Sequence, residues 1–295
     1  MSDLHALRQV SVAVLACNRR EDLRLTLRTL VASGAPWHEI IVADNASSDG
    51  TATMLRDEFP TVRVLASPTN DGVAALNRAY RAASGSWILS LDDDSCPDLD
   101  SWGALARALA ADPPFAAVTC SVRARPSRSQ SSPIAPASSP LAPYLGFHQA
   151  GGLLRRDTVE RLGGFDEELF LWGVELHLAA RAALAGLAFA RCDSAVVVHR
   201  NTPVNRSSRR HAFHYCRNLL LLLLRYAPES SQRLLVDRFL ARVLLFSLLH
   251  HTSAYVRAVR DASAIHRRTR IRKPLTDHQF AAMNPDLRSS FSFLG

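Results

Sequence analysis

The chain has 295 residues, 47% of them apolar, and its 35 lysines and arginines exceed its 27 acidic residues by a net charge of +8. This length and apolar content exclude a small disulfide-bonded scaffold and a wholly disordered chain, and they allow one large domain or a domain with an appendage. Residues 1–199 carry 18 basic and 22 acidic side chains, whereas residues 200–295 carry 17 and 5. The basic character therefore belongs to the last third of the chain.

The spacing of the cysteines and the length of the apolar runs indicate where in the cell the protein is expected. The five cysteines lie far apart and lack the paired spacing of zinc sites. The first residues do not have the pattern of a signal peptide. The longest apolar runs, at residues 219–224 and 243–249, are shorter than the roughly 20 residues that span a bilayer. These features predict reduced thiols and a cytoplasmic location, with peripheral association at the inner face of the membrane left open.

Apolar segments alternate with segments of helical periodicity through the first part of the chain. Strands are expected at residues 10–15, 39–43, 62–65 and 87–91, and helices at residues 23–31, 51–59 and 74–83. This alternation predicts an α/β fold with a mainly parallel sheet flanked by helices. Ligands of such sheets bind at the carboxyl ends of the strands, where this sequence carries Asn18, Asp44 and the aspartates at 92–94.

The pattern is interrupted at residues 124–143, where five prolines and six serines predict a flexible insert. Strands and helices then resume as far as residue 199. Long helices are expected at residues 217–226 and 233–251, and residues from 261 onward read as a loosely held basic tail. We therefore expect a domain over residues 1–205, a helical appendage over 206–260 and a tail over 261–295.

Three adjacent aspartates, Asp92, Asp93 and Asp94, directly follow the apolar strand expected at residues 87–91. Adjacent carboxylates repel one another unless a cation neutralises them, and hard divalent cations prefer oxygen ligands. Alternate side chains of an extended segment share a face, so Asp92 and Asp94 can address one ion while Asp93 points elsewhere. Taken alone, an acidic triplet in a turn is more often a solvated cap than a metal site.

The ordered segments at residues 10–19, 40–51, 70–77 and 91–94, the later run at 162–175 and the pair Arg217–Asn218 closely resemble the family 2 glycosyltransferases, rhamnosyltransferase-like members in particular. The resemblance covers roughly residues 10–226. It implies the GT-A fold, which is Rossmann-like, here with a helical C-terminal appendage.

The resemblance also implies a nucleotide site. Asn18 and Asp44 match positions that contact the base and ribose, where a carboxylate accepts a hydrogen bond from a base N–H. Asn70, Gly72 and Asn77 match the segment beside the nucleotide, where glycine allows close approach of the backbone.

A metal site is implied in the same way. Asp92 and Asp94 match the DxD motif that holds Mn²⁺ or Mg²⁺ against the donor diphosphate, and Asp93 lies beside the donor. His199 resembles a third metal ligand found in some members, although a capping or core histidine fits that position equally well.

The catalytic base departs from the family pattern. The family's Glu-Asp pair falls on Val174 and Glu175, so the resemblance implies Glu175 as the base that accepts the proton of the acceptor nucleophile. His177 occupies a following position that is usually acidic, which leaves a histidine-assisted or histidine-based variant open.

Two residues near the base are implied on the acceptor side. Asp166 would bind hydroxyl groups, and Trp172 would stack on a sugar face. The structural alternatives are a helix N-cap for Asp166 and a core position for Trp172.

The function implied is a metal-dependent inverting transfer of a sugar, of the hexosyl type, from a nucleoside diphosphate to a hydroxyl or amine of a small-molecule, glycan or lipid-linked acceptor. The alternative is a catalytically impaired protein that only binds nucleotide sugars, because Val174 and His177 replace acidic residues. The arginines of the last third alternate with leucines rather than aromatic residues, which argues against a nucleic-acid surface. Arg238 and Arg242 lie four apart on an apolar helix, which favours peripheral membrane contact, packing on the domain or a homodimer.

Overall fold

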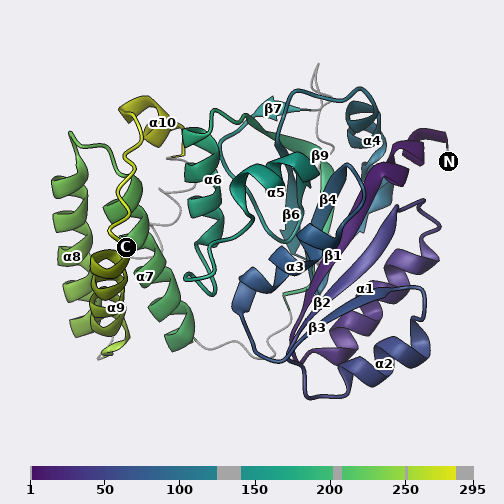
Figure 1. Ribbon diagram of the computed structural model, residues 1–295, viewed down its shortest axis with the longest axis horizontal. Coiled ribbons are helices and arrows are strands. Elements are labelled where there is room, and N and C mark those ends of the chain that lie inside the picture. The colour runs from purple at the N-terminus through teal and green to yellow at the C-terminus, as the bar shows by residue number, and fades with distance from the viewer. Residues whose placement is uncertain (1, 125–140, 202–207, 250–251, 284–295) are drawn as a thin grey trace. The chain divides into compact units, whose positions relative to one another are not determined.

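Figure 1 shows the computed structural model of the protein, which describes residues 2–124, 141–201, 208–249 and 252–283. The insert expected at residues 124–143 falls almost entirely outside these ranges. The chain forms two compact units. Unit 1 comprises residues 1–165 and 187–204, and unit 2 comprises residues 166–186 and 205–295.

Unit 1 is built on a nine-stranded sheet with the order β3-β2-β1-β4-β8-β6-β9-β5, to which β7 is added by pairing with β9. The strands within the described ranges are β1 (Val10–Ala16), β2 (Glu39–Asn45), β3 (Arg63–Ser67), β4 (Trp87–Asp92), β5 (Ser95–Asp98), β6 (Ala117–Ala124), β7 (Ala142–Pro143), β8 (Gly152–Arg155) and β9 (Phe189–His199). Strands β3, β2, β1 and β4 are parallel, whereas β8 is antiparallel to both β4 and β6. The sheet is therefore mixed rather than mainly parallel.

The helices of unit 1 connect these strands. They are η1 (Ser2–Gln9), α1 (Arg20–Ala32), α2 (Thr51–Glu58), η2 (Gly72–Ala75), α3 (Leu76–Ala82), η3 (Leu99–Ser101), α4 (Gly103–Ala110) and α5 (Arg156–Leu162). The strands and helices expected before residue 91 are all present. The helix expected at residues 74–83 differs in beginning as the 3₁₀ turn η2.

The core of unit 1 lies on β1 and β4, whose residues are buried on both faces, as is typical of central parallel strands. Trp102 connects this core to the far half of the sheet. Its side chain is fully buried, its indole Nε1 donates to the carbonyl oxygen of Val196 at 2.9 Å, and its ring meets Trp37 edge-on. This contact holds the end of β9, where His199 lies.

Unit 2 consists of helices. They are α6 (Val174–Leu184), α7 (Ser208–Tyr226), α8 (Gln232–Leu249), α9 (Ala254–Thr269) and α10 (Asp277–Ala282). The leucines at 219–223 of α7 are all buried, and α7 packs against α6, α8 and α9. Of the helices that the structure describes, none combines the length and apolar content needed to cross a bilayer.

Two boundaries differ from the expectation. The tail expected from residue 261 is wrong for residues 261–283, because α9 runs through residue 261 and buries Ala258, Ala262 and Ile265. Further along, α10 begins with a capping box formed by Thr276 and Gln279. The second difference concerns α6, which belongs to unit 2 and not to the domain expected over residues 1–205.

Candidate active site

Four strands of unit 1 end at one edge of the sheet. β1, β2 and β4 run parallel, with Leu15 opposite Asp92 and Ala16 opposite Asp44. Two successive antiparallel pairings, through β8 and β6, restore the direction of β4, and β9 runs parallel to β6. His199, the last residue of β9, therefore lies at the same edge as the aspartates that follow β4.

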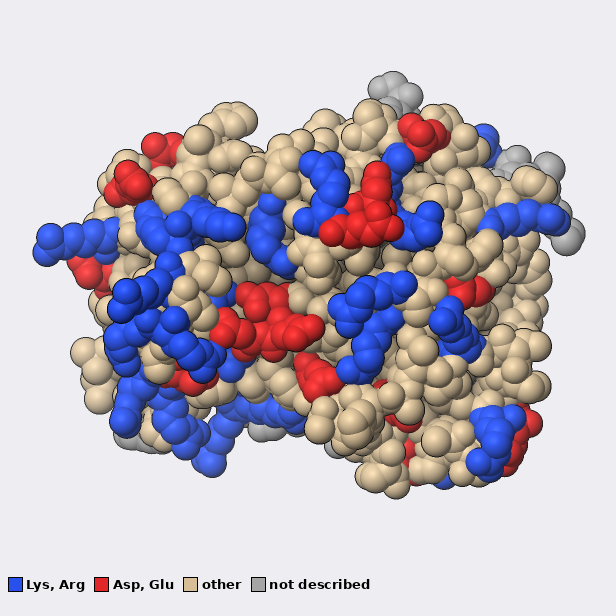
Figure 2. All heavy atoms as spheres, viewed as in Figure 1, with Lys and Arg blue, Asp and Glu red and all other residues tan. Residues whose placement is uncertain are grey.

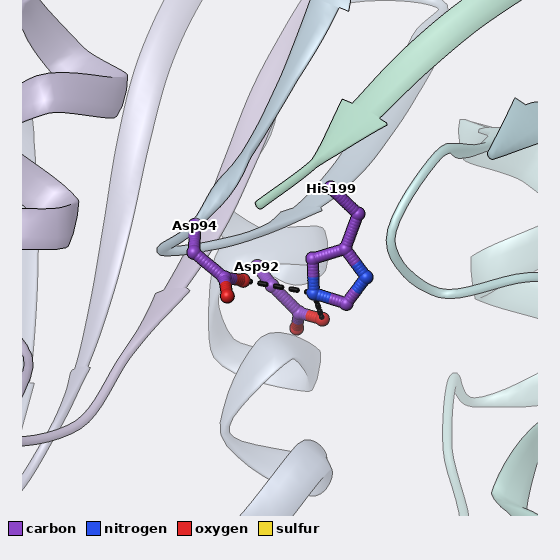
Figure 3. A group of neighbouring side chains, drawn as sticks. All are labelled: Asp92, Asp94 and His199. Atoms are coloured by element: carbon purple, nitrogen blue, oxygen red, sulfur yellow. Dashed lines mark ion pairs between the residues drawn. The ribbon is translucent and has the colours of Figure 1, made fainter. Parts of the chain in front are cut away.

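The three residues expected to bind a metal are brought together at this edge (Figure 3). The chain reverses after β4 into β5, which pairs with β9 so that Ser95 lies opposite His199. His199 Nε2 is 2.8 Å from Asp94 Oδ1 and 3.6 Å from Asp92 Oδ2. One ligand atom from each residue lies within 4.8 Å of the others. Two carboxylates and an imidazole that converge in this way fit a divalent cation such as Mn²⁺ or Mg²⁺.

The backbone of the aspartate turn is fixed by side chains. Ser95 Oγ accepts a hydrogen bond from the amide of Asp92 at 2.8 Å and donates to its carbonyl oxygen at 3.1 Å. The carbonyl oxygen of Asp93 accepts from Thr26 Oγ1 at 2.6 Å and from Arg200 Nη2 at 3.1 Å. Sequence reasoning missed Arg200, although the residue directly follows His199.

Arg19 bridges two of the aspartates and was also missed as a part of the site. Its guanidinium contacts Asp93 Oδ1 and Asp94 Oδ2, each at 2.8 Å. Burial opposes ionisation of Asp94, but the hydrogen bonds from His199 and Arg19 outweigh it and hold the pKa of Asp94 well below its usual value. Burial raises the pKa of Asp93 well above its usual value, even though Arg19 opposes the shift. Asp94 is thus the aspartate kept ionised, with one oxygen held by Arg19 and the other facing His199.

The loops after β1 and β2 are tied together near the predicted nucleotide contacts. Asn18 has a positive φ of 52°, its amide donates to Ser47 Oγ at 3.0 Å, and its Oδ1 accepts from the amide of Ser48 at 2.7 Å. Asp44 is 4% exposed, and its Oδ1 accepts from the amide of Ser47 at 3.1 Å. Both residues shape the loops at the edge where a nucleotide is expected.

The segment at residues 70–72 is attached to the end of β2 by Asn45. The Asn45 amide nitrogen donates to Asn70 Oδ1 at 2.9 Å, and its oxygen accepts from the amide of Asp71 at 2.8 Å. Gly72 has a φ of 64°, which glycine adopts without strain. The structure thus brings Asn70 and Gly72 to the same edge, with Asn45 as a connector that the sequence did not single out.

Asn77 does not occupy the position expected of a nucleotide contact. It is 2% exposed, its Nδ2 donates to the carbonyl oxygen of Phe165 at 2.8 Å, and its Oδ1 accepts from the amide of the same residue at 2.8 Å. The amide group is therefore fully engaged by the backbone, and a Cβ at Gly164 would lie 2.2 Å from Asn77 Oδ1. We assign Asn77 a structural role.

In unit 2, the loop that precedes α6 is held in an unusual conformation. Three of its residues have positive φ values, namely Phe170, Trp172 and Gly173. Asn218 Nδ2, from α7, donates at 2.7 to 2.9 Å to three carbonyl oxygens of this loop, those of Leu169, Leu171 and Trp172. The neighbouring Arg217 donates to the carbonyl oxygen of Glu168 at 3.1 Å. The Arg217–Asn218 pair thus holds the loop that leads to Glu175.

Glu175 lies in the first turn of α6 and is partly exposed. The amide groups at a helix N-terminus favour the ionised carboxylate, which a general base requires. Trp172, three residues earlier, is partly exposed, and its ring meets the ring of His211 at a centroid distance of 4.6 Å. The ring of His214 lies 6.2 Å from the Trp172 ring as well, so two histidines of α7 border this tryptophan.

Asp166 forms an ion pair within unit 2. Its Oδ2 contacts Arg225 Nη1 at 2.8 Å, and its Oδ1 accepts from the amide of Glu168 at 3.1 Å. Arg225 is fully buried and also contacts Glu168. The alternative of a helix N-cap is wrong, because α6 begins only at Val174, and the expected contact with acceptor hydroxyls would compete with this pair.

His177 is enclosed. It is 0% exposed, and its Nε2 lies 2.9 Å from the carbonyl oxygen of Asn218, to which it donates. Burial lowers the pKa of His177 to about 4, so the ring is neutral at pH 7. A side chain without access to solvent is not placed to take a proton from an acceptor, and the geometry does not support a histidine base.

Comparisons with known proteins identify the family of this chain. The family model of the glycosyl transferase family 2 matches residues 11–158, and the chain belongs to that family. A protein from Haemophilus influenzae, described as an uncharacterized glycosyltransferase, is 32% identical over 88 residues. That match covers 30% of this chain and only 30% of the relative.

Solved structures show the fold. The mannosyltransferase PcManGT from Pyrobaculum calidifontis, in complex with GDP-Man and Mn²⁺, superimposes with a TM-score of 0.56 at 20% identity, covering 96% of this chain and 80% of that one. S. aureus TarS 1-349 gives a TM-score of 0.57 at 18% identity, covering 86% and 79%. GalNAc-T7 with UDP, GalNAc and Mn²⁺ gives 0.57 at 15% identity, covering 72% and 47%. The chain therefore has the GT-A fold with a helical C-terminal region.

Proposed function

We propose that this glycosyltransferase is metal-dependent and inverting, and that it moves a sugar from a nucleoside diphosphate to a hydroxyl or amine of an acceptor. The observation that carries the proposal is the convergence of Asp92, Asp94 and His199 at the edge of the sheet that also holds Asn18 and Asp44. Structures of similar fold were solved with GDP-Man and Mn²⁺ and with UDP-GlcNAc, which supports the same classes of ligand here.

Each group of site residues has its own role in the proposed reaction. Asp92, Asp94 and His199 would hold Mn²⁺ or Mg²⁺, which when bound supplies a positive charge against the leaving diphosphate. Asn18 and Asp44 orient the base and ribose. Glu175 accepts the proton of the acceptor nucleophile as that atom attacks the anomeric carbon opposite the diphosphate, and attack from that side inverts the configuration.

The acceptor class and location extend this proposal. We place small molecules, glycans and lipid-linked compounds among the acceptors and favour a hexosyl donor. All five cysteines are free thiols, four of them buried, which supports a reducing compartment such as the cytoplasm. A thermal-shift screen of GDP, UDP and dTDP and their sugars, each with Mn²⁺, identifies the nucleotide.

The first test removes a metal ligand. Asp94→Asn keeps the shape of the side chain but removes the charge that Arg19 and His199 surround, so we expect Mn²⁺ affinity to fall by more than about tenfold and turnover to be lost. Titration calorimetry and release of nucleoside diphosphate from a panel of nucleotide sugars measure the two effects. Asp57→Asn, at a surface position in α2, is the matched control and retains both. An Asp94→Asn variant with full activity would contradict the metal site.

The second test separates catalysis from binding. Glu175→Gln should lower kcat by about 10²- to 10⁴-fold, because a general base is lost, while nucleotide affinity stays within about twofold. Glu167→Gln, which changes an exposed glutamate before the same helix, should leave turnover unchanged. Normal turnover of Glu175→Gln would show that another group is the base. A wild-type protein that binds nucleotide sugars with Mn²⁺ but neither hydrolyses nor transfers them would favour the catalytically impaired alternative.

A further inference from the structure

Unit 2 contains a cavity of about 460 Å³ among the end of α7, the start of α8 and the end of α9. Its lining residues are Leu224, Gln232, His266, Arg267, Arg270 and Arg272. Three guanidinium groups and an imidazole thus surround one space, and no acidic residue lines it. Figure 2 shows Lys and Arg side chains gathered over the part of the surface where Figure 1 places α8 and α9.

Three acidic residues of unit 2 form ion pairs with other arginines. Asp166 and Glu168 pair with Arg225, Glu168 also pairs with Arg268, and Asp261 pairs with Arg217. Among the residues that the structure describes, Arg267, Arg270 and Arg272 have no carboxylate within ion-pair distance. Such a concentration of unneutralised charge is costly, and an anion in the cavity would relieve it.

The backbone holds these arginines in place. Arg270 ends α9 with a φ of 50°, a conformation in which a helix usually ends on glycine or asparagine. The segment that follows is attached to the end of α7, because the amide of Lys273 donates to the carbonyl oxygen of Arg225 at 2.8 Å and Arg272 Nη1 donates to the same oxygen at 3.4 Å. The backbone of the cavity wall is therefore a fixed part of the fold, and the exposed side chains of Arg267 and Arg270 extend from it.

His266 shows the same electrostatic surroundings. Its Nδ1 is shielded from solvent and has no hydrogen-bond partner among the described residues. Burial lowers the pKa of His266, and the nearby charges of Arg225 and Arg272 lower it further. Because Nδ1 is shielded from solvent, the arginine side chains are the groups of this cavity that a bound anion contacts.

We propose that this cavity binds a phosphate group of a diphosphate or phosphomonoester through Arg267, Arg270 and Arg272. Guanidinium groups bind phosphate oxygens through paired N–H donors, and several such groups around one space are typical of phosphate recognition. The volume of about 460 Å³ is in the range of small-molecule sites and exceeds what inorganic phosphate needs, so the ligand carries an organic group or a second phosphate. This site lies wholly in unit 2 and requires no metal, which distinguishes it from the donor site of unit 1.

The test measures binding of inorganic pyrophosphate to the full chain in EDTA, which removes divalent cations from the unit 1 site. We expect binding by titration calorimetry, and about tenfold weaker binding for each of the variants Arg267→Gln and Arg270→Gly, because each removes charge-assisted hydrogen bonds. Arg270→Gly also removes the strain of a positive φ, so its melting temperature should equal or exceed that of the wild type. Arg257→Gln removes one exposed charge from the same helix outside the cavity and should bind pyrophosphate as the wild type does.

A second arm identifies the source of the phosphate by using vesicles of phosphatidylcholine with and without phosphatidic acid. Binding to phosphatidic acid vesicles that pyrophosphate displaces, and that the two variants lose, assigns the cavity to a lipid headgroup. Pyrophosphate binding without vesicle binding assigns it to a soluble phosphate compound. The proposal fails if neither probe binds in EDTA, or if Arg257→Gln weakens binding as much as the cavity variants do, because the attraction would then be general charge.

Discussion

Asp94 is held from three sides in unit 1. His199 contacts one carboxylate oxygen, Arg19 contacts the other, and the amide of Arg200 donates to the backbone carbonyl oxygen at 2.9 Å. A side chain with 0% exposure and this many partners has one orientation available. Sites that bind metal ions depend on ligands preset in this way. Arg19 therefore acts on the site through Asp94, by fixing it and keeping it ionised.

His177 provides a prediction on the pH dependence of stability. Its pKa is about 4 in the folded protein, compared with 6.5 for an unperturbed histidine. Burial is the largest cause of this lowering, and the charges of Arg225 and Arg181 add to it. The hydrogen bond to Asn218 and the charge of Asp166 raise the pKa and so oppose the shift. Folding thus favours the neutral ring. The stability that this provides is fully present above pH 6.5 and is lost as the pH falls toward 4, by up to about 1.4 kcal/mol per pH unit.

We expect His177→Gln, whose amide can still donate to Asn218, to flatten the pH dependence in that window. Urea unfolding at intervals from pH 7 to pH 4 measures the difference. His278→Gln, at an exposed position of the same unit, should follow the wild-type curve. Parallel loss of stability in wild type and His177→Gln would contradict the prediction.

The turn from β4 into β5 is the element that brings the three proposed metal ligands together. Without β5, the aspartates would end one strand and His199 would end another, three positions along the sheet order. Because β5 pairs antiparallel with β9, the reversal places Ser95 opposite His199 and brings the aspartates beside it. A short strand of four residues thus places the aspartates of the motif beside the third proposed metal ligand.

Helix α8 is apolar on two sides. Phe239 and Val243 are buried, whereas Leu244 and Leu248 are 60% and 64% exposed. A contiguous patch of exposed leucines of this kind marks a surface that another protein or a membrane covers. We expect sedimentation velocity to show a concentration-dependent dimer that the double variant Leu244→Gln and Leu248→Gln abolishes.

The matched control for this experiment is Leu25→Gln, which changes a leucine that is 49% exposed in α1 of unit 1. It should leave the dimer intact. A monomeric wild type that binds anionic vesicles at low salt through these leucines would instead assign the exposed face of α8 to a membrane surface.

Strand and helix periodicity were sufficient to predict the first half of unit 1, because buried strands such as β1 and β4 carry uninterrupted apolar runs. The same reasoning failed for α9, whose many arginines suggested a tail. The signal was present in the four-residue spacing of Ala254, Ala258 and Ala262, small residues that pack closely on α7. Small apolar residues contribute little to hydropathy, so a charged helix with an alanine face resembles a disordered segment.

The metal ligands could be proposed from the sequence because strand ends of a parallel sheet meet at one edge. The partners of those ligands could not. Arg19 reaches Asp94 across 75 positions in the sequence, and Asn77 is bound to Phe165 across 88. Such contacts form only when distant parts of the chain pack together. No local sequence pattern therefore predicts which residue a long arginine side chain or a side-chain amide will bind.

The net charge of the molecule is distributed unequally between the two units. Unit 1 contains 18 basic and 18 acidic residues, so its net charge is zero, whereas unit 2 contains 17 and 9. The entire net charge of +8 therefore belongs to the helical unit. Long-range attraction of anionic ligands is correspondingly a property of unit 2, and it is expected to weaken as salt is added.

The assignment of α6 to unit 2 limits how this protein can be recombined with other members of its family. The family model ends at residue 158, before α6 begins. The segment 166–186, which carries Glu175, packs with residues that follow 205 and depends on Asn218 for the shape of its first loop. A chimera that exchanges the segment of the proposed base must therefore exchange the C-terminal helices with it, whereas the sheet with its three proposed metal ligands can be kept.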